Sequence, residues 1–306
     1  FTLNELNAKE ASGLELRSMK SVVTIANEGI FFEKLHLQTP YSTITDEFKM
    51  HTSNYQSYAY FIDSVYMSGS LNNSVIDVRD IVYFSDYLEE YKGQSARISG
   101  RVNGVLRKLK IRDTRIDYGN NTRIVTNGKI RGLPFWDDTY LDFKFKELRT
   151  DYEDINDIGF IDELPDFMKQ AGLLEYKGEF KGFHNDFVTY GSLVSDVGML
   201  YSDLNFKVGE GHPETYSGRI AGDDFALGRL LGLNELGSTS FEFNLKEGRG
   251  LNLDDFKTTF TGTIKDIHYD GYRYVNTEVK GEFDQMKFDG EVQINDPNLV
   301  VDFKGE

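Results

Sequence analysis

The stretch Phe256-Lys257-Thr258-Thr259-Phe260-Thr261-Gly262-Thr263-Ile264 alternates between large apolar or small residues and polar residues. A β-strand directs successive side chains to opposite faces, so this pattern predicts a strand with one apolar face and one polar face. The same alternation recurs at residues 141–145, 204–208 and 241–245. The chain is therefore expected to be all-β.

A short glycine phrase, Gly-x-apolar-x-Gly, recurs within such runs. It occurs at residues 100–104, 128–132, 178–182 and 218–222. A glycine inside a strand marks a bulge, a bend or a close approach of two backbones. The irregular spacing of the phrases does not fit a solenoid of fixed period. These features predict an elongated, curled, mostly antiparallel β-sheet.

Three segments have helical rather than strand spacing, and we expect a few short amphipathic helices that close the ends or the mouth of the sheet. They are residues 80–91, 161–171 and 223–236, the last with Asp223 or Asp224 as its N-cap. The pairs Asp270-Gly271 and Asp289-Gly290 predict hairpin turns.

One-sided strands need a cover for their apolar face. A second sheet, closure of the sheet into a barrel, or an apolar ligand lying in a groove could each supply it, and all three share one alternation pattern. If the face is a groove, its expected lining residues are Ile116, Tyr118, Leu141, Phe143, Phe145, Leu204, Phe206, Val208, Phe241, Phe243, Leu245, Phe256, Phe260 and Ile264.

The charge balance argues against several partners. The chain of 306 residues has 34 Lys and Arg against 50 Asp and Glu, a net charge of −16. Nucleic-acid binding needs a positive face, so we expect no nucleic-acid partner. Direct docking on an anionic membrane surface is disfavoured for the same reason.

No residue cluster predicts catalysis, a cofactor or a metal. Cysteine is absent and the five histidines are scattered, which removes thiolate nucleophiles and the common zinc motifs. The acidic run at residues 151–157 lacks the glycine and the final acid of a calcium loop, so we expect a solvated loop there. Asp137 and Asp138, beside Trp136, point to opposite faces if they lie on a strand, and a polar turn is the better interpretation. The chain is expected not to be an enzyme.

Several motifs resemble the TamB branch of the AsmA-like family, the translocation and assembly module, in its Bacteroidetes type. The resemblance covers most of the chain. The motifs that carry it most clearly are Ser99-Gly100-Arg101-Val102-Asn103-Gly104, Gly128-Lys129-Ile130-Arg131-Gly132-Leu133-Pro134, Asp224-Phe225-Ala226-Leu227-Gly228-Arg229-Leu230-Leu231-Gly232-Leu233 and Tyr269-Asp270-Gly271-Tyr272.

The resemblance implies a periplasmic bridge tethered to the inner membrane by a helix that this chain does not contain. It implies an elongated β-groove, a taco-like repeating sheet, that conducts phospholipid or another acyl-chain lipid between membranes, or that assists outer-membrane protein assembly. It also implies an Omp85-type outer-membrane barrel as partner, contacted through a part absent here. Residues 1–306 are then expected to be one continuous piece of a larger β-groove protein, subdivided at 1–174 and 175–306. The alternative is a structural or adhesive envelope protein, a β-solenoid or β-sandwich, whose apolar face is a packed core.

Overall fold

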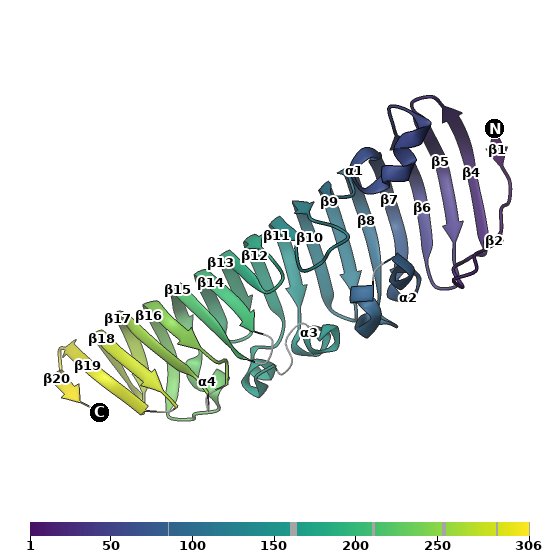
Figure 1. The fold of residues 1–306 in the computed structure, drawn as a ribbon. Helices are drawn as coiled ribbons and strands as arrows, with labels where there is room; N and C mark the ends of the chain where they lie inside the picture. Colours follow the sequence, from purple (N-terminus) through teal and green to yellow (C-terminus); the bar gives the residue numbers. More distant parts are fainter. Residues whose placement is uncertain (85, 160–163, 210–211, 253–254, 286, 306) are drawn as a thin grey trace. The chain divides into compact units, whose positions relative to one another are not determined.

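Short connections between consecutive strands make the sheet antiparallel, because only antiparallel neighbours can be joined by tight turns. A computed structural model describes residues 1–84, 86–159, 164–209, 212–252, 255–285 and 287–305 (Figure 1). Within these described ranges, the main sheet has 18 antiparallel strands and does not close into a barrel. The prediction of a curled all-β fold with a few short helices is confirmed.

The chain divides into two compact units, Phe1–Glu147 (unit 1) and Leu148–Glu306 (unit 2). The expected division at 174 and 175, and the expectation that the chain is one piece of a larger groove protein, stay predictions.

In unit 1, β1 pairs with β4, and the strands from β4 to β10 then pair in chain order. The Thr126 hydroxyl donates to the Lys144 carbonyl at 3.0 Å, which ties β10 to β11. A separate two-stranded sheet joins β2 and β3. The bounds are β1 (Thr2–Leu3), β2 (Ala8–Lys9), β3 (Glu15–Leu16), β4 (Ser18–Ala26), β5 (Gly29–Gln38), β6 (Thr43–His51), β7 (Tyr66–Asp77), β8 (Ser95–Val105), β9 (Lys108–Tyr118), β10 (Thr122–Arg131) and β11 (Tyr140–Thr150).

In unit 2, each strand from β12 to β20 pairs antiparallel with the next. Bulges shift the register of the β15–β16 and β16–β17 pairs, and a bulge bends the strand that carries it. The bounds are β12 (Leu174–Gly182), β13 (Asp186–Ser195), β14 (Gly198–Gly209), β15 (His212–Phe225), β16 (Leu236–Arg249), β17 (Lys257–Tyr269), β18 (Tyr272–Asp284), β19 (Lys287–Asp296) and β20 (Leu299–Gly305).

One of the two predicted hairpin turns is correct. Asp270 and Gly271 join β17 to β18 with φ angles of 47° and 77°, as a two-residue turn requires. The turn predicted at Asp289-Gly290 is wrong, because both residues lie inside β19, where Gly290 pairs with Gly281 of β18.

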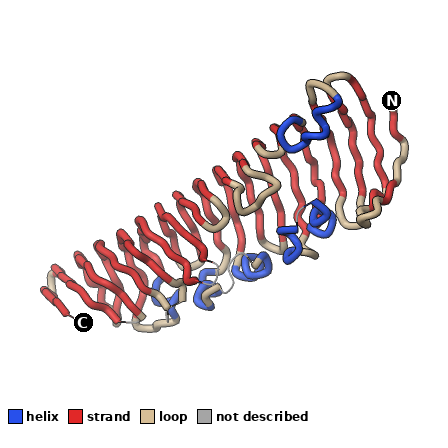
Figure 2. The backbone as a smooth tube through the Cα atoms, viewed as in Figure 1, coloured by secondary structure: helices blue, strands red, loops and turns tan. Residues whose placement is uncertain are grey.

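The helical segments lie at the ends of strands in each unit, as Figure 2 shows. They are η1 (Tyr55–Tyr60), α1 (Phe61–Ser64), α2 (Val78–Ile81), η2 (Val82–Phe84), η3 (Asp86–Tyr91), α3 (Tyr152–Ile158), η4 (Asp166–Ala171) and α4 (Leu227–Leu231). Of the predicted helix at 80–91, residue 85 lies outside the described residues, and the rest corresponds to the end of α2 followed by η2 and η3. Of the one predicted at 161–171, residues 161–163 lie outside the described residues and Asp166–Ala171 form a 3-10 helix.

Two local predictions are wrong. Asp223 and Asp224 do not cap a helix. β15 continues through both of them to Phe225, so α4 spans only Leu227–Leu231. The acidic run after Asp151 is a helix rather than a solvated loop. The Asp151 carboxylate caps α3 by accepting a hydrogen bond from the Asp154 amide at 2.9 Å.

Two buried clusters lie where strands end. In unit 1, Val65, Met67 and Leu109 form a cluster against which Tyr58 and Leu133 pack. In unit 2, the cluster is formed by Ala171, Leu174, Val197 and Phe225, and residues of η4 and α4 pack on it. These clusters stabilise the ends of the strands that contribute to them.

Candidate functional site

The middle of the unit 2 sheet carries a continuous apolar face. Phe241 of β16 lies opposite Ile264 of β17, and Leu245 lies opposite Phe260 on the same two strands. Each pair has its Cα atoms in register and its side chains on one face of the sheet. All four side chains are half-buried. The alternation seen in the sequence therefore produces a shared apolar surface across neighbouring strands.

Two rows of aromatic rings run across the strands of unit 2. In the first aromatic row, successive ring centroids lie 4.6 to 6.2 Å apart. In the second, they lie 5.4 to 6.3 Å apart. Both ranges fit favourable aromatic pairing. The first aromatic row is Phe180, Phe187, Phe206, Tyr216, Phe256 and Phe283, and the second is Phe225, Phe241, Phe243, Phe260 and Phe288.

Glycines on the same face make room for these rings. A Cβ atom added to Gly262 would lie 2.3 Å from the Phe243 ring and 2.2 Å from the Glu242 carbonyl oxygen. A Cβ atom added to Gly248 would lie 2.2 Å from the Tyr216 ring. Aromatic rings that lie over strand glycines cover backbone that no side chain protects. The strand glycines thus have a packing role beside the aromatic rows.

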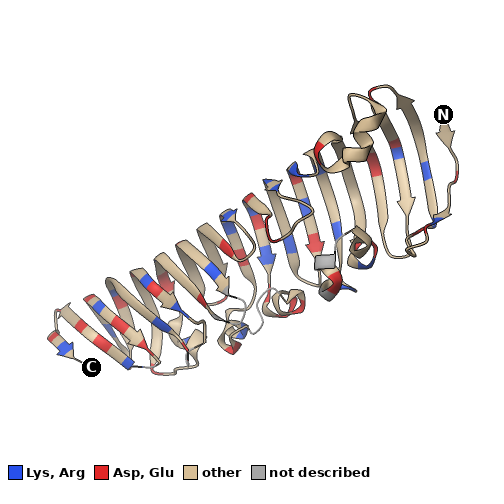
Figure 3. Cartoon of the chain, in the orientation of Figure 1, with Lys and Arg blue, Asp and Glu red and all other residues tan. Residues whose placement is uncertain are grey.

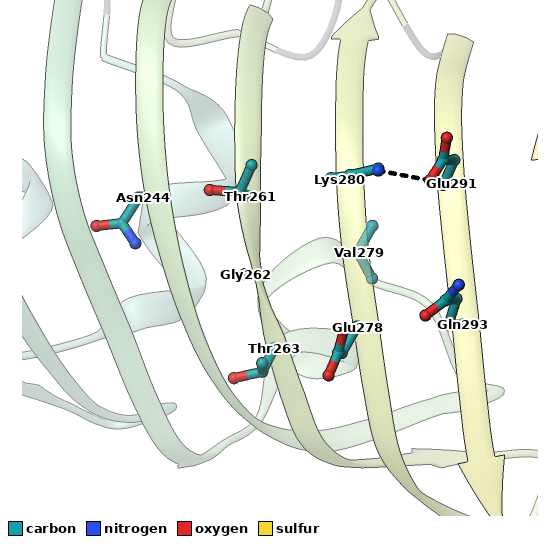
Figure 4. A pocket seen from close by; sticks show the side chains of 9 residues that line it. All are labelled: Asn244, Thr261, Gly262, Thr263, Glu278, Val279, Lys280, Glu291 and Gln293. Atoms are coloured by element: carbon teal, nitrogen blue, oxygen red, sulfur yellow. Dashed lines mark ion pairs between the residues drawn. The ribbon is translucent and has the colours of Figure 1, made fainter.

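The opposite face of unit 2 is polar from β15 to β19. Arg219 of β15 forms an ion pair with Glu242 of β16 at 2.9 Å. Glu291 of β19 forms ion pairs with Lys280 at 2.6 Å and with Lys304 at 2.9 Å. A shallow hollow of this face lies between Asn244, Thr261, Lys280 and Glu291, and Figure 4 shows the Lys280–Glu291 pair at its edge. Such exposed pairs contribute little stability. Their main effect is to keep this face of the sheet solvated.

The other predicted lining residues lie as follows. Leu204, Phe206 and Val208 are on β14 of unit 2 and are half-buried, and Phe256 directly precedes β17. The rest belong to unit 1, on β9 (Ile116 and Tyr118) and on β11 (Leu141, Phe143 and Phe145).

Unit 1 carries an apolar face of its own. Ile116 lies between Ile98 of β8 and Ile124 of β10. The Phe143 ring lies beside Gly128, whose added Cβ atom would approach it to 2.1 Å. The Leu141 side chain is buried, while Phe143 is half-buried. The pairing of an aromatic ring with a strand glycine therefore occurs in both units.

Several residues of the aromatic rows were missing from the predicted set. Phe180 is the apolar residue of the glycine phrase at 178–182, so that signal was present in the sequence. Around Tyr216 and Phe225, apolar and polar residues alternate less regularly along the sequence. The complete set of missed rings is Phe180, Phe187, Tyr216, Phe225, Phe283 and Phe288.

The extent of burial distinguishes the middle of the sheet from its ends. Phe243, Phe260 and Phe288 are half-buried, whereas Val197 and Phe225 in the end cluster are 2% and 4% exposed. The interior of a sandwich is packed as densely as a crystal, with the inward side chains at the middle of its strands buried. Among the described residues, the apolar face of unit 2 thus remains partly open to solvent.

The Tyr216 hydroxyl is a polar group within the first aromatic row. The side chain is 8% exposed, and its oxygen has no hydrogen-bond partner in the part of the chain that the structure describes. Burial raises the pKa of Tyr216 well above its ordinary value, so the hydroxyl is neutral at physiological pH.

We expect Tyr216→Phe to stabilise the protein. A buried hydroxyl without a partner costs about 1 to 3 kcal/mol, and the substitution removes it while keeping the ring. A gain of about 1 kcal/mol in the free energy of unfolding is expected in urea titrations. Tyr176→Phe is the control and should destabilise, because the Tyr176 hydroxyl lies 2.7 Å from the Thr189 hydroxyl. A loss of stability in Tyr216→Phe would show that the hydroxyl has a partner.

The described residues contain no group of three or more His, Asp or Glu side chains placed to hold a metal ion. Asp137 and Asp138 are exposed in the loop between β10 and β11. Across the described ranges, no helix is both long and apolar enough to cross a membrane. Comparison of the chain with protein-family models, curated proteins and solved structures finds no match.

Proposed function

We propose that the apolar face of unit 2 holds the acyl chain of a lipid and shields it from water. The observation that carries this proposal is the half-buried state of the large apolar side chains in the middle of the sheet, such as Phe243 and Phe260. Each methylene of an acyl chain kept from water contributes ~0.8 kcal/mol. A face made mostly of large apolar side chains lets such a chain lie along several strands and slide without a deep energy minimum.

The two aromatic rows support this role. They supply flat, rigid apolar surface, and the strand glycines between them allow the rings to lie close to the backbone. The polar face with its ion pairs keeps the other side of the sheet in water. This division of the two faces suits a protein that carries an apolar ligand through an aqueous compartment.

The resemblance extends the proposal to a cellular role. On that basis, the chain is part of a periplasmic protein, tethered to the inner membrane through a segment outside this chain. It would conduct phospholipid between the membranes or assist outer-membrane protein assembly, with an Omp85-type barrel as partner. The mechanism is partition of the lipid between water and the apolar face, and it requires no catalytic residue.

Site-specific photo-crosslinking tests the acyl-chain proposal. A photoreactive amino acid at Phe243 or Phe260 is expected to capture lipid during expression, which mass spectrometry of the purified protein detects. The matched controls are the adjacent positions Glu242 and Thr261, whose side chains point to the polar face, and these should capture none. Equal capture from both faces would contradict the proposal. A folded protein without captured lipid at any position would favour the structural envelope protein.

A further inference from the structure

Six aromatic side chains are exposed at the same end of the strands of unit 1. They come from three segments, namely η1 with α1, the start of β7, and the loop between β10 and β11. Tyr60 is 73% exposed and Tyr55 is 68% exposed, far more than a packed aromatic ring. We call this set the aromatic rim: Tyr55, Tyr60, Phe61, Tyr66, Phe135 and Trp136.

Contacts between the loops hold the rim together. The Arg107 amide, in the turn between β8 and β9, donates to the Ile62 carbonyl at 3.3 Å, and the Arg107 carbonyl accepts from the Gly132 amide at 3.0 Å. The Arg107 side chain donates to the Asp63 carboxylate at 2.6 Å, and its guanidinium carbon lies 6.0 Å from the centre of the Phe135 ring. Arg107 thus connects α1 to the loop between β10 and β11.

The rim rests on a packed base. Tyr58 of η1 and Leu133 of the loop between β10 and β11 both pack on the buried cluster of Val65, Met67 and Leu109. The Thr139 hydroxyl donates a hydrogen bond to the Phe135 carbonyl at 2.7 Å, which closes the loop between β10 and β11. Exposed rings on a fixed base cost little conformational entropy when they bind a surface.

The first aromatic segment of the rim, residues 52–62, is poor in charge. Residues 52–62 contain no charged side chain, although 27% of the chain's residues are charged. Figure 3 shows the segment of η1 and α1 almost without coloured residues. Asp63 is paired with Arg107. Further charged groups beside the rim are Lys108 and Arg131, which lie opposite each other on β9 and β10, and the carboxylates of Asp137 and Asp138, which follow Trp136.

We infer that the aromatic rim seats unit 1 on the surface of an electrically neutral lipid bilayer. Tyrosine and tryptophan combine an apolar ring with a polar tip, and they concentrate where hydrocarbon meets water. Beside the rim, the three basic side chains of Arg107, Lys108 and Arg131 are matched in number by the carboxylates of Asp63, Asp137 and Asp138. This balance suits zwitterionic headgroups better than anionic ones. The carboxylates of Asp137 and Asp138 avoid hydrocarbon, so they limit the rim to headgroup depth. The inference does not depend on lipid binding by unit 2.

The chain contains a single tryptophan, Trp136, and it lies in the rim. Its fluorescence therefore reports on this surface in the intact, unlabelled protein. On addition of phosphatidylcholine vesicles, Trp136 emission is expected to shift to shorter wavelength, and phosphatidylcholine brominated in its acyl chains should quench it. Vesicles rich in phosphatidylglycerol should bind less at low salt. Unchanged emission with no co-sedimentation would overturn the inference, and so would a rim that binds a protein but no vesicle.

A triple variant localises the contact. Tyr55→Ser, Tyr60→Ser and Phe135→Ser together are expected to weaken vesicle binding at least tenfold, while Trp136 remains as reporter. The matched control is Tyr190→Ser with Tyr201→Ser, which removes two rings of similar exposure, 67% and 50%, from unit 2. An equal loss in both variants would overturn the inference. If the triple variant fails to fold, the quenching of Trp136 in the wild-type protein decides the matter alone.

The two proposals can fail separately. Photo-crosslinking at Phe243 or Phe260 reports only on the apolar face of unit 2. Trp136 quenching reports only on the rim. Vesicle binding without crosslinked lipid would leave the rim supported and the acyl-chain proposal contradicted, and the opposite result would reverse this.

Discussion

Phe260→Asp is expected to abolish lipid capture while the protein stays folded. Phe260 lies between two rings of the second aromatic row, 5.4 Å from the Phe243 ring and 6.2 Å from the Phe288 ring. Because it is half-buried, a carboxylate at this position reaches water and avoids most of the penalty of a buried charge. The same carboxylate would have to be covered by an acyl chain, which costs well over the ~1.4 kcal/mol that corresponds to a tenfold loss of affinity.

Lipid content of the purified variant and its circular dichroism check this prediction. Thr261→Asp is the matched control, since it places the same charge one residue further along β17 on the polar face, and it should keep both fold and lipid. Retained lipid in Phe260→Asp would contradict the acyl-chain proposal. Global unfolding would favour the structural alternative, in which the same face is a dry core.

Gly262→Val is expected to be among the most destabilising single substitutions in unit 2. The added side chain would meet the Phe243 ring and the Glu242 carbonyl oxygen, and the backbone oxygen cannot move aside cheaply. Overpacking of this kind costs about 1 to 3 kcal/mol, and the combined clash places Gly262→Val at the upper end, near 3 kcal/mol. Urea titration should show this as a lower transition midpoint.

Thr263→Val is the control for this substitution. Thr263 is the next residue on β17, its side chain is exposed on the polar face, and valine suits a strand. Its effect should stay within about 0.5 kcal/mol. Similar losses from both substitutions would mean that β17 is sensitive to any change and that the glycine has no special packing role.

The prediction of strands from alternation succeeded where one face is apolar and the other is polar. Phe241, Phe243 and Leu245 lie on one face of β16 as the pattern required. It failed for residues 223–236, where leucines at helical spacing outweighed the pairing of Phe225 with Thr239. That pairing is made with a segment more than ten residues away, which no local window contains.

Glycine was the least decisive signal. Asp270-Gly271 and Asp289-Gly290 have the same two residue types, yet the first is a turn and the second lies within β19. In the first, Gly271 adopts a positive φ of 77°. In the second, Gly290 lies against Gly281 and the Phe288 ring, so it serves close packing. The dipeptide alone does not distinguish these two uses of glycine.

The sequence by itself determined the strands whose apolar and polar residues alternate clearly, and which of their side chains share a face, because the two-residue period of a strand is a local property of the backbone. Only the tertiary structure decided which rings meet. Tyr216 lies beside Phe256, and Phe256 beside Phe283, through registers that depend on bulges and turns far along the chain. Only the tertiary structure also decided that the rings of unit 2 stay half-buried in the middle of the sheet, because burial depends on what covers a face and alternation is the same for a covered face and an open one.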